Sequence, residues 1–284
     1  MDIDLTARAA HARILSAQDS HDNTGCVFSY IENVPKKREK MRLPTLLLSS
    51  GQLPPYLLLP GDPARAAQIA ARLDQTEALA KNREFHSYRG LYRGISVGVV
   101  STGVGSPGAA ICAEESIHAG AQVLLRVGTA GSLQDNVTDG ALVVATGAVR
   151  GDGTSQQLLP AEYPAVADHE VVDALWRAAN TLEARVHRGV AVTYDAFYRG
   201  VLDLRFGILS QAGALCVEME CAAIFCVALL RGVKAGAILA IDGDARQSST
   251  GAYNPHREVV HSAIDLEITA ALEAIVHLSQ GEDK

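Results

Sequence analysis

An arginine interrupts a short apolar segment in the middle of the 284-residue chain. Arg126 lies within residues 123–127, which are predicted to form a strand buried on both faces, and a buried guanidinium needs an anionic partner. That partner is either an internal carboxylate or a bound anion at the carboxyl end of the strand, where ligands of open α/β sheets bind. Thr129, between Gly128 and Gly131, adds a hydroxyl and a permissive backbone at the same edge.

A second candidate anion site is Pro60-Gly61-Asp62-Pro63, between a predicted strand and a predicted helix. Amide groups at a helix start attract anions, and Gly61 lets an anion approach the backbone closely. Arg65, one turn into the helix, can add charge-assisted hydrogen bonds, so a phosphate would fit here. The alternative is an ordinary turn with a surface arginine, because short motifs often match by chance.

The segment Gly103–Gly108 matches the G-x-G-x-x-G pattern of dinucleotide-binding loops. That pattern normally has an acidic residue about 20 positions later to hold a ribose, and residues 123–128 contain none. Arg126 could instead face a 2′-phosphate, so binding of a phosphorylated nicotinamide cofactor remains an alternative. A purely structural interpretation is that Ser106 caps a helix and Pro107 occupies its first turn.

Two carboxylates, Glu218 and Glu220, are predicted to open an otherwise apolar helix. They could simply complement the helix dipole. The apolar flanks indicate burial instead, and a buried carboxylate is well satisfied by the paired hydroxyls of a ribose. Asp242 ends a predicted buried strand, where a raised pKa would let its carboxyl group act as a general acid.

The elements that must position these residues alternate along the chain, as expected for an α/β protein. Apolar runs predict strands at 56–59, 97–101, 123–127, 142–148, 189–193 and 237–241. Apolar periodicity predicts helices at 64–73, 107–119, 169–182, 221–230 and 258–278. We therefore predict an α/β fold of a single domain with three layers, in which helices flank a central mixed, mostly parallel sheet.

Composition limits the remaining possibilities. The net charge of −7 argues against a protein that neutralises the phosphates of a nucleic acid. Five cysteines without C-x-x-C spacing indicate neither a disulfide framework nor a zinc site, and they favour a cytoplasmic location. No apolar stretch reaches the roughly 20 residues that span a bilayer. Residues 1–40 are predicted to be an N-terminal arm, mobile or due to a mis-called start, and 41–284 the domain.

Taken together, these stretches resemble the nucleoside phosphorylase family that contains uridine phosphorylases and hexameric purine nucleoside phosphorylases. The resemblance extends from Leu46 to Leu278, and its landmarks occur in the family's order. They are Pro60-Gly61-Asp62-Pro63, Asn82-Arg83-Glu84-Phe85, Ser101-Thr102-Gly103-Val104-Gly105, Leu125-Arg126-Val127-Gly128-Thr129, Phe197-Tyr198 and Val217-Glu218-Met219-Glu220.

The resemblance implies a role for each landmark. Phosphate would be bound by Gly61, Arg65, Arg126 and Thr129, together with Arg83 from a neighbouring subunit. Glu218, Met219 and Glu220 would hold the ribose. Phosphate would attack as the glycosidic bond lengthens, while phosphate and Glu220 stabilise positive charge on the sugar. Inorganic phosphate is then a co-substrate and no cofactor or metal is implied. Active sites would be shared within dimers, and three dimers commonly form a hexamer.

The resemblance is less informative about which base the site accepts. Uridine phosphorylases carry Gln and Arg shortly after the Phe-Tyr pair, whereas this chain has Val201 and Asp203 there. By resemblance, Phe197 and Asp242 would contact the base, with Asp242 on N7 of a purine, so purine nucleosides are favoured. Thr45 stands where the family usually has the histidine that binds the 5′-hydroxyl.

Four alternatives remain from the sequence. A uridine phosphorylase shares the landmarks. A hydrolytic nucleosidase of the same fold generally lacks the phosphate arginines, so Arg65, Arg83 and Arg126 argue against it. A reductase would bind a dinucleotide at Gly103–Gly108. A nucleoside-binding protein without activity would bind but not turn over.

Overall fold

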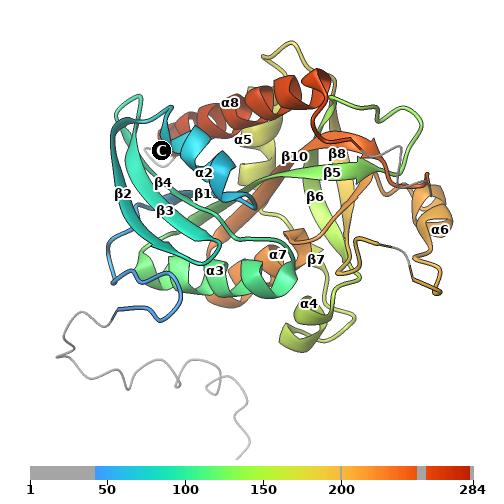
Figure 1. Ribbon diagram of the computed structural model, residues 1–284, viewed down its shortest axis with the longest axis horizontal. Coiled ribbons are helices and arrows are strands. Elements are labelled where there is room, and N and C mark those ends of the chain that lie inside the picture. Colours follow the sequence, from blue (N-terminus) through green and yellow to red (C-terminus); the bar gives the residue numbers. More distant parts are fainter. Residues whose placement is uncertain (1–41, 199, 248–253, 282–284) are drawn as a thin grey trace, which may run out of the picture. The chain divides into compact units, whose positions relative to one another are not determined.

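A computed structural model describes residues 42–198, 200–247 and 254–281, all within the compact unit Lys40–Lys284 (Figure 1). The predicted arm at 1–40 lies outside the described residues, so its proposed boundary stays a prediction. Within the described ranges, no helix is long and apolar enough to cross a membrane. The cysteines of these ranges, which are Cys112, Cys216, Cys221 and Cys226, are buried and free.

Four parallel strands form the centre of a mixed sheet. In spatial order they are β4 (Ile95–Val100), β1 (Tyr56–Pro60), β5 (Val123–Ser132) and β10 (Lys234–Asp244). Their inner residues are apolar on both faces, as buried parallel strands require. Because the strands run the same way, their carboxyl ends meet at one edge of the sheet.

The other strands extend this centre on both sides. The antiparallel hairpin β2 (Asp74–Asn82) and β3 (Phe85–Tyr92) continues beyond β4. On the other side, β10 pairs with β6 (Leu142–Arg150), which pairs with β8 (Val186–Thr193) and with the short β7 (Ala165–Val166). β9 (Cys216–Glu218) joins β8 to the end of β5, so the pairings return to β5 and close a ring.

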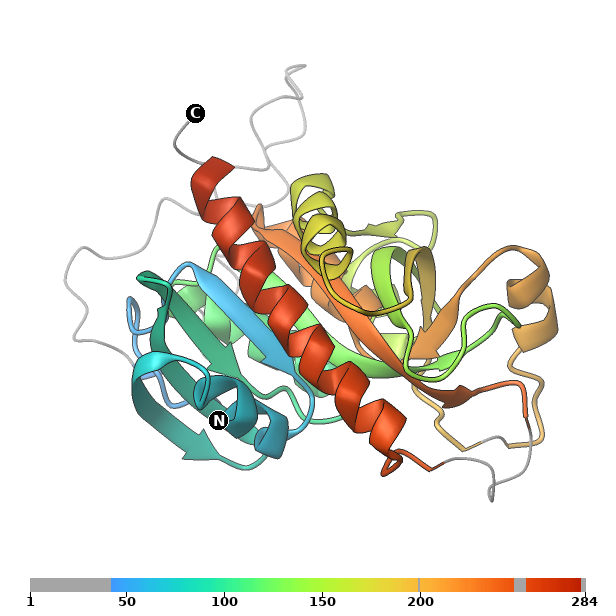
Figure 2. The same ribbon diagram turned by 90° about the horizontal axis from the view of Figure 1, so that it is seen from above.

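Helices cover the two faces of the sheet (Figures 1 and 2). One face carries α2 (Pro63–Ala70), α5 (His169–Ala179) and the long α8 (Glu258–Gly281). The other carries α3 (Ser106–Ala119) and α7 (Cys221–Arg231), with the short α4 (Gly153–Leu158) against α7. A further short helix, α6 (Phe206–Gln211), lies in the connection from β8 to β9. The predicted three-layer α/β fold is confirmed.

Local sequence explains where the helices start. Asp62, Asp152 and Asp168 cap α2, α4 and α5, each accepting a hydrogen bond from an amide of the first turn. Pro63 then occupies the first position of α2, where a missing N–H costs nothing. In α8 the predicted apolar face, including Ile268, is buried against the sheet and α5.

The sequence predicted β1, β4, β5, β6, β8 and β10 but missed the hairpin β2–β3 and the short strands β7 and β9, and two local expectations are wrong. Glu218 does not open α7: it ends β9, and Glu220 is the N-cap of the helix. Ser106 does not cap α3, because the N-cap is Gly105 and the Ser106 hydroxyl donates a 2.9 Å hydrogen bond to the carbonyl of Met219. For Ser106, a tertiary contact replaced the local cap that the sequence pattern indicated. Glu218 still accepts hydrogen bonds from amides at the start of α7, but it does so from the end of β9.

The α8 face should contribute strongly to stability. We expect Ile275→Ala, at a fully buried position, to lower the free energy of unfolding by about 2–5 kcal/mol through lost burial and a residual cavity. The matched control is Ile208→Ala in α6, where the side chain is 64% exposed and a change within about 0.5 kcal/mol is expected. Urea denaturation measures both, and equal losses would show that α8 does not pack as described.

Candidate active site

A cavity of about 1120 Å³ opens at the edge where the central parallel strands end. Nine of the residues singled out from the sequence line it, and they come from strand ends, helix starts and the segment after β8. These are Gly61, Arg65, Arg126, Thr129, Phe197, Glu218, Met219, Glu220 and Asp242. The fold therefore brings together segments that are up to 181 residues apart in the chain.

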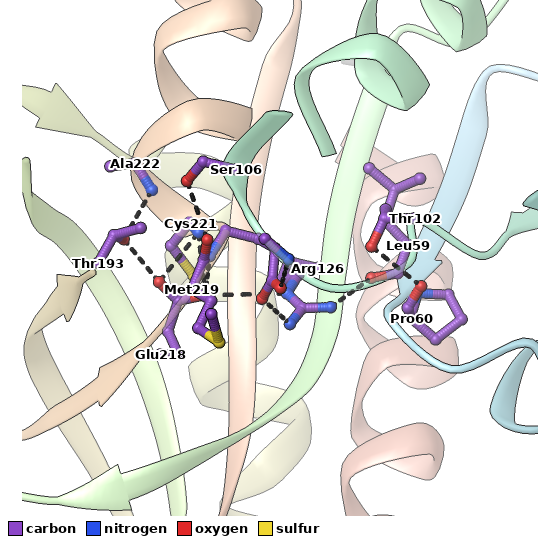
Figure 3. A network of polar contacts seen from close by, with 12 residues as sticks. Leu59, Pro60, Thr102, Ser106, Arg126, Thr193, Glu218, Met219, Cys221 and Ala222 are labelled. Carbon is purple, nitrogen blue, oxygen red and sulfur yellow. Dashed lines mark hydrogen bonds and ion pairs between the residues drawn. The ribbon is translucent and has the colours of Figure 1, made fainter. Parts of the chain in front are cut away.

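Arg126 lies at the floor of the cavity and is 4% exposed. Its Nη2 forms a salt bridge with Glu220, and its Nη1 donates a 3.5 Å hydrogen bond to the carbonyl of Leu59 (Figure 3). Burial alone would lower the pKa of Arg126. The nearby Glu220 and Glu218 outweigh this effect and raise the pKa above its usual value, so the guanidinium is charged. The internal salt bridge considered from the sequence is thus present, in a residue that also lines the cavity.

Two glycines make room for this guanidinium. A Cβ atom on Gly128 would lie 2.7 Å from Cζ and Nη2 of Arg126, and one on Gly61 would lie 3.4 Å from Nη1. The Gly61 Cβ would also meet the carbonyl of Gly103 at 3.2 Å. Glycine at position 128 is therefore a packing requirement of the buried arginine, whereas at position 61 the tighter neighbour is the backbone of Gly103.

Glu220 joins three elements. Its Oε1 accepts a 2.6 Å hydrogen bond from the amide of Gly105, at the start of α3, and its Oε2 pairs with Arg126. The backbone of Glu220 is the N-cap of α7. The Gly105 amide, which a dinucleotide-binding loop would offer to a pyrophosphate, is thus already bound to a carboxylate of the protein. This contact argues against the dinucleotide interpretation of Gly103–Gly108.

Glu218 is satisfied entirely by the protein (Figure 3). Its carboxylate accepts hydrogen bonds from the Thr193 hydroxyl at 2.6 Å, from the Glu220 amide at 2.8 Å and from the Cys221 amide at 2.9 and 3.0 Å. Burial and the nearby Glu220 raise the pKa of Glu218, against the opposing effect of Arg126. Its direct function is to bind the amides that begin α7 and so to set the position of Met219 and Glu220.

Arg65 projects from the first turn of α2, beside the loop at Gly61. Its side chain is 13% exposed, and its Nη1 lies 3.8 Å from Oε2 of Glu267 on α8. The anion-attracting helix start predicted from Pro60-Gly61-Asp62-Pro63 is present, with Asp62 as the cap. Arg65 and Arg126 thus bring two guanidinium groups into one cavity.

Asp242 occupies a β-bulge. The register of β10 against β5 shifts between Ile241 and Gly243, so Asp242 is an extra residue in the strand. A β-bulge changes the direction in which a side chain points. This explains how Asp242, although it belongs to a buried strand, can line the cavity. The carbonyl of Asp242 accepts a 2.8 Å hydrogen bond from Arg257, which also pairs with Asp139.

Arg257 and Asp139 also line the cavity, and the sequence analysis missed both. Neither lies in a recognisable motif: Asp139 precedes β6, and Arg257 precedes α8. Their only sequence signal is a charge next to an element boundary, which is common on any surface. Glu267 was missed as well, although an acid on the apolar face of the predicted final helix was visible in the sequence.

Arg83 and Thr45 are not among the residues that line this cavity. Arg83 is exposed in the turn between β2 and β3, where it has a φ of 51°. The neighbouring Asn82 donates a 2.8 Å hydrogen bond from Nδ2 to the carbonyl of Thr45, whose amide donates to Glu115. The two predicted site residues are therefore linked through Asn82, and neither lines the cavity of its own chain, although Glu84 next to Arg83 does.

The comparisons with known proteins agree with this geometry. Residues 55–276 match the family model described as the phosphorylase superfamily. Guanosine phosphorylase of Halorubrum lacusprofundi is 39% identical over 201 residues, which cover 71% of this chain and 83% of that protein. Uridine phosphorylase of Treponema pallidum is 35% identical over 233 residues, covering 78% and 90%.

A solved structure of a related enzyme is also similar to this chain. Purine nucleoside phosphorylase of Toxoplasma gondii, in complex with immucillin-H, has a TM-score of 0.82 and 31% sequence identity, covering 86% of this chain and 100% of that one. The fold and the site define an α/β enzyme whose cavity lies at the carboxyl edge of a parallel sheet. The chain belongs to the phosphorylase superfamily and is a pentosyltransferase of the nucleoside phosphorylase type. Its reaction is the phosphorolysis of nucleosides.

The packing of Arg126 against Gly128 yields a direct test. We expect Gly128→Ala to displace the guanidinium from Glu220 and to lower kcat/KM for phosphorolysis on the order of 10²-fold, because misplacing a group in an active site by about 1 Å has effects of that size. The matched control is Gly207→Ala in α6, where nothing lies within 4 Å of the added Cβ. Steady-state kinetics with varied phosphate measures both; equal activity of the two variants would contradict the packing requirement.

Proposed function

We propose that this enzyme favours purine nucleosides and splits them with phosphate into a free base and ribose 1-phosphate. The observation that supports the proposal most is the single cavity in which Arg65, Arg126, Glu220 and Asp242 meet. This cavity brings together two arginines that would bind phosphate, a carboxylate that would face the sugar and a carboxyl group that would donate a proton to the base.

Phosphate would bind between the start of α2 and the end of β5. Gly61 and Thr129 offer backbone and hydroxyl donors, and Arg65 and Arg126 supply positive charge at the same place. Arg126 uses Nη2 for Glu220, and its Nη1 makes a long 3.5 Å hydrogen bond to the carbonyl of Leu59. The remaining capacity of Nη1 would serve the phosphate, whereas Nε faces Oε2 of Glu218 at 3.9 Å.

The ribose would lie against Met219 and Glu220. Glu220 is held from both sides, by Arg126 and by the Gly105 amide, so its carboxylate keeps one position as positive charge develops on the sugar. Glu218 would act on the ribose through this segment, since its own oxygens are occupied by Thr193 and the start of α7.

The base would lie between Asp242 and the segment after β8. Phe197 is 55% exposed in the cavity wall and packs edge-on against Tyr198, with ring centroids 5.0 Å apart. Val201, which stands where uridine phosphorylases place a uracil-reading side chain, is fully exposed. A protonated Asp242 could donate to N7 of a purine as the bond from C1′ to the base breaks. A uridine phosphorylase is the second candidate, supported by relatives of that name.

Arg83 would complete the phosphate site of a neighbouring subunit. It is exposed and is not one of the residues that line the cavity of its own chain, and the Asn82–Thr45 hydrogen bond places Thr45 near the same turn. Both residues would then reach the cavity of a second copy, in a dimer or in a hexamer made of three dimers. This arrangement implies that one chain alone has an incomplete site.

The preferred base is tested by a substrate panel. We expect base release from inosine and guanosine to exceed release from uridine by at least about tenfold in kcat/KM and to depend on phosphate. Chromatographic detection of the free base, with and without phosphate, measures this. Faster release from uridine would support the pyrimidine alternative, and release that ignores phosphate would indicate a hydrolase.

Asp242 is tested by removing only its acidity. We expect Asp242→Asn to lower kcat for inosine on the order of 10²-fold, because the amide cannot transfer a proton to the leaving base. Asp173→Asn, at an exposed ion pair with Arg188, is the matched control and should retain activity. An unchanged kcat in Asp242→Asn would show that this carboxylate is structural.

Shared sites are tested by complementation. Arg83→Ala and Asp242→Asn should each be nearly inactive alone. Coexpressed as mixed dimers, they should regain about a quarter of wild-type activity, because half of the dimers are mixed and one of their two sites has both residues intact. No recovery in purified mixed dimers would place Arg83 in the site of its own chain or outside it.

A further inference from the structure

A buried carboxyl group lies behind the proposed phosphate site and has no part in the function described above. Glu267 belongs to α8 and is 0% exposed, and its neighbours in the chain are the apolar residues Leu266 and Ile268. Neither of its oxygens makes a close hydrogen bond within the described residues. An ionised carboxylate in such a place is costly unless cations compensate it.

The charged groups around Glu267 belong mostly to the proposed phosphate site. Arg65 of α2 is nearest, with 3.8 Å between its Nη1 and Oε2 of Glu267. Arg126 and the Gly128 amide of β5 also favour the charged carboxylate, whereas Asp242 of β10 opposes it. The helix α5 packs against α8 through apolar residues such as Val171 and Leu175. Figures 1 and 2 show α2 and α8 side by side over the sheet.

These opposing influences leave Glu267 easily protonated. Burial raises its pKa to about 8, because desolvation outweighs the lowering by Arg65 and Arg126. Below this pH the carboxyl group is neutral and does not compete for Arg65. Above it, an ionised Glu267 attracts Arg65 and repels any anion bound to the same guanidinium groups.

We propose that Glu267 is a positioning residue for phosphate, which binds Arg65 only when the carboxyl group of Glu267 carries a proton. This inference rests on the proposed phosphate site. One proton moves from solvent to a Glu267 oxygen as the phosphate dianion enters, so the buried site exchanges one anionic partner of Arg65 for another. The added negative charge then holds that proton more tightly.

Calorimetry on the wild-type enzyme tests the proton uptake without any variant. Inorganic phosphate is titrated at about pH 8 into the enzyme in two buffers of different ionisation enthalpy. About half of the Glu267 groups are ionised there before binding, so we expect uptake of about 0.4 proton per site. Phosphate binding without proton uptake overturns the inference. Failure of phosphate to bind overturns the proposed phosphate site itself.

The variant Glu267→Gln mimics the protonated state at every pH. In the wild type we expect the KM for phosphate, expressed as the concentration of its dianion, to rise about tenfold between about pH 7 and about pH 9, since about nine-tenths of Glu267 is ionised at the higher pH. In Glu267→Gln we expect a rise of less than about threefold and no proton uptake. The same nucleoside is used throughout, so its own ionisation affects both enzymes equally.

The matched control is Asp265→Asn on the same helix. Asp265 also links α8 to α2, through Arg72 at 2.5 Å, but its side chain is 57% exposed. This variant should keep the wild-type rise in KM, which separates burial beneath the phosphate site from helix docking. An equal rise in the wild type and in Glu267→Gln would assign Glu267 to the stability of the fold alone. If Glu267→Gln fails to fold, the calorimetry on the wild type decides the question.

Discussion

The site depends on one buried ion pair, Arg126 with Glu220. A guanidinium in the centre of an apolar sheet is tolerated only because a carboxylate from a distant segment reaches it, and that carboxylate is itself held by the Gly105 amide. The pair connects β5, the start of α3 and the start of α7. Both members are almost completely buried, and electrostatic stabilisation of a reacting group is strong where water is largely excluded.

The surrounding backbone is adapted to this pair. Gly61 and Gly128 leave space for the guanidinium, and Glu218 binds the amides at the start of α7 so that Glu220 faces Arg126. The bulge in β10 brings Asp242 to the same cavity from a strand that pairs with β5. The glycines, the Glu218 hydrogen bonds and the bulge in β10 all help to place functional side chains at the carboxyl edge of the sheet.

Charge balance in the cavity links these residues to the layer behind them. Among the residues proposed to face the substrates, Arg65 and Arg126 are positive and Glu220, Glu218 and Asp242 are acidic, and Arg257 and further carboxylates line the rest of the cavity. A phosphate dianion bound at the proposed site would therefore enter a region where the protonation of buried carboxyl groups affects its binding. Glu267, covered by α8 and next to Arg65, is part of this balance even though it lies behind the site.

Much of this protein could be predicted from its sequence alone. Apolar runs and helix caps determined the long core strands and helices, because burial and capping are local properties of the chain. Ordered motifs, with Arg126 within an apolar run, indicated the family and most of the predicted residues that line the candidate site. Tertiary structure alone decided which carboxylate Arg126 binds, that Glu218 ends a strand, and that Arg257 and Glu267 approach the site. These outcomes depend on contacts between segments distant in sequence, which no local pattern records.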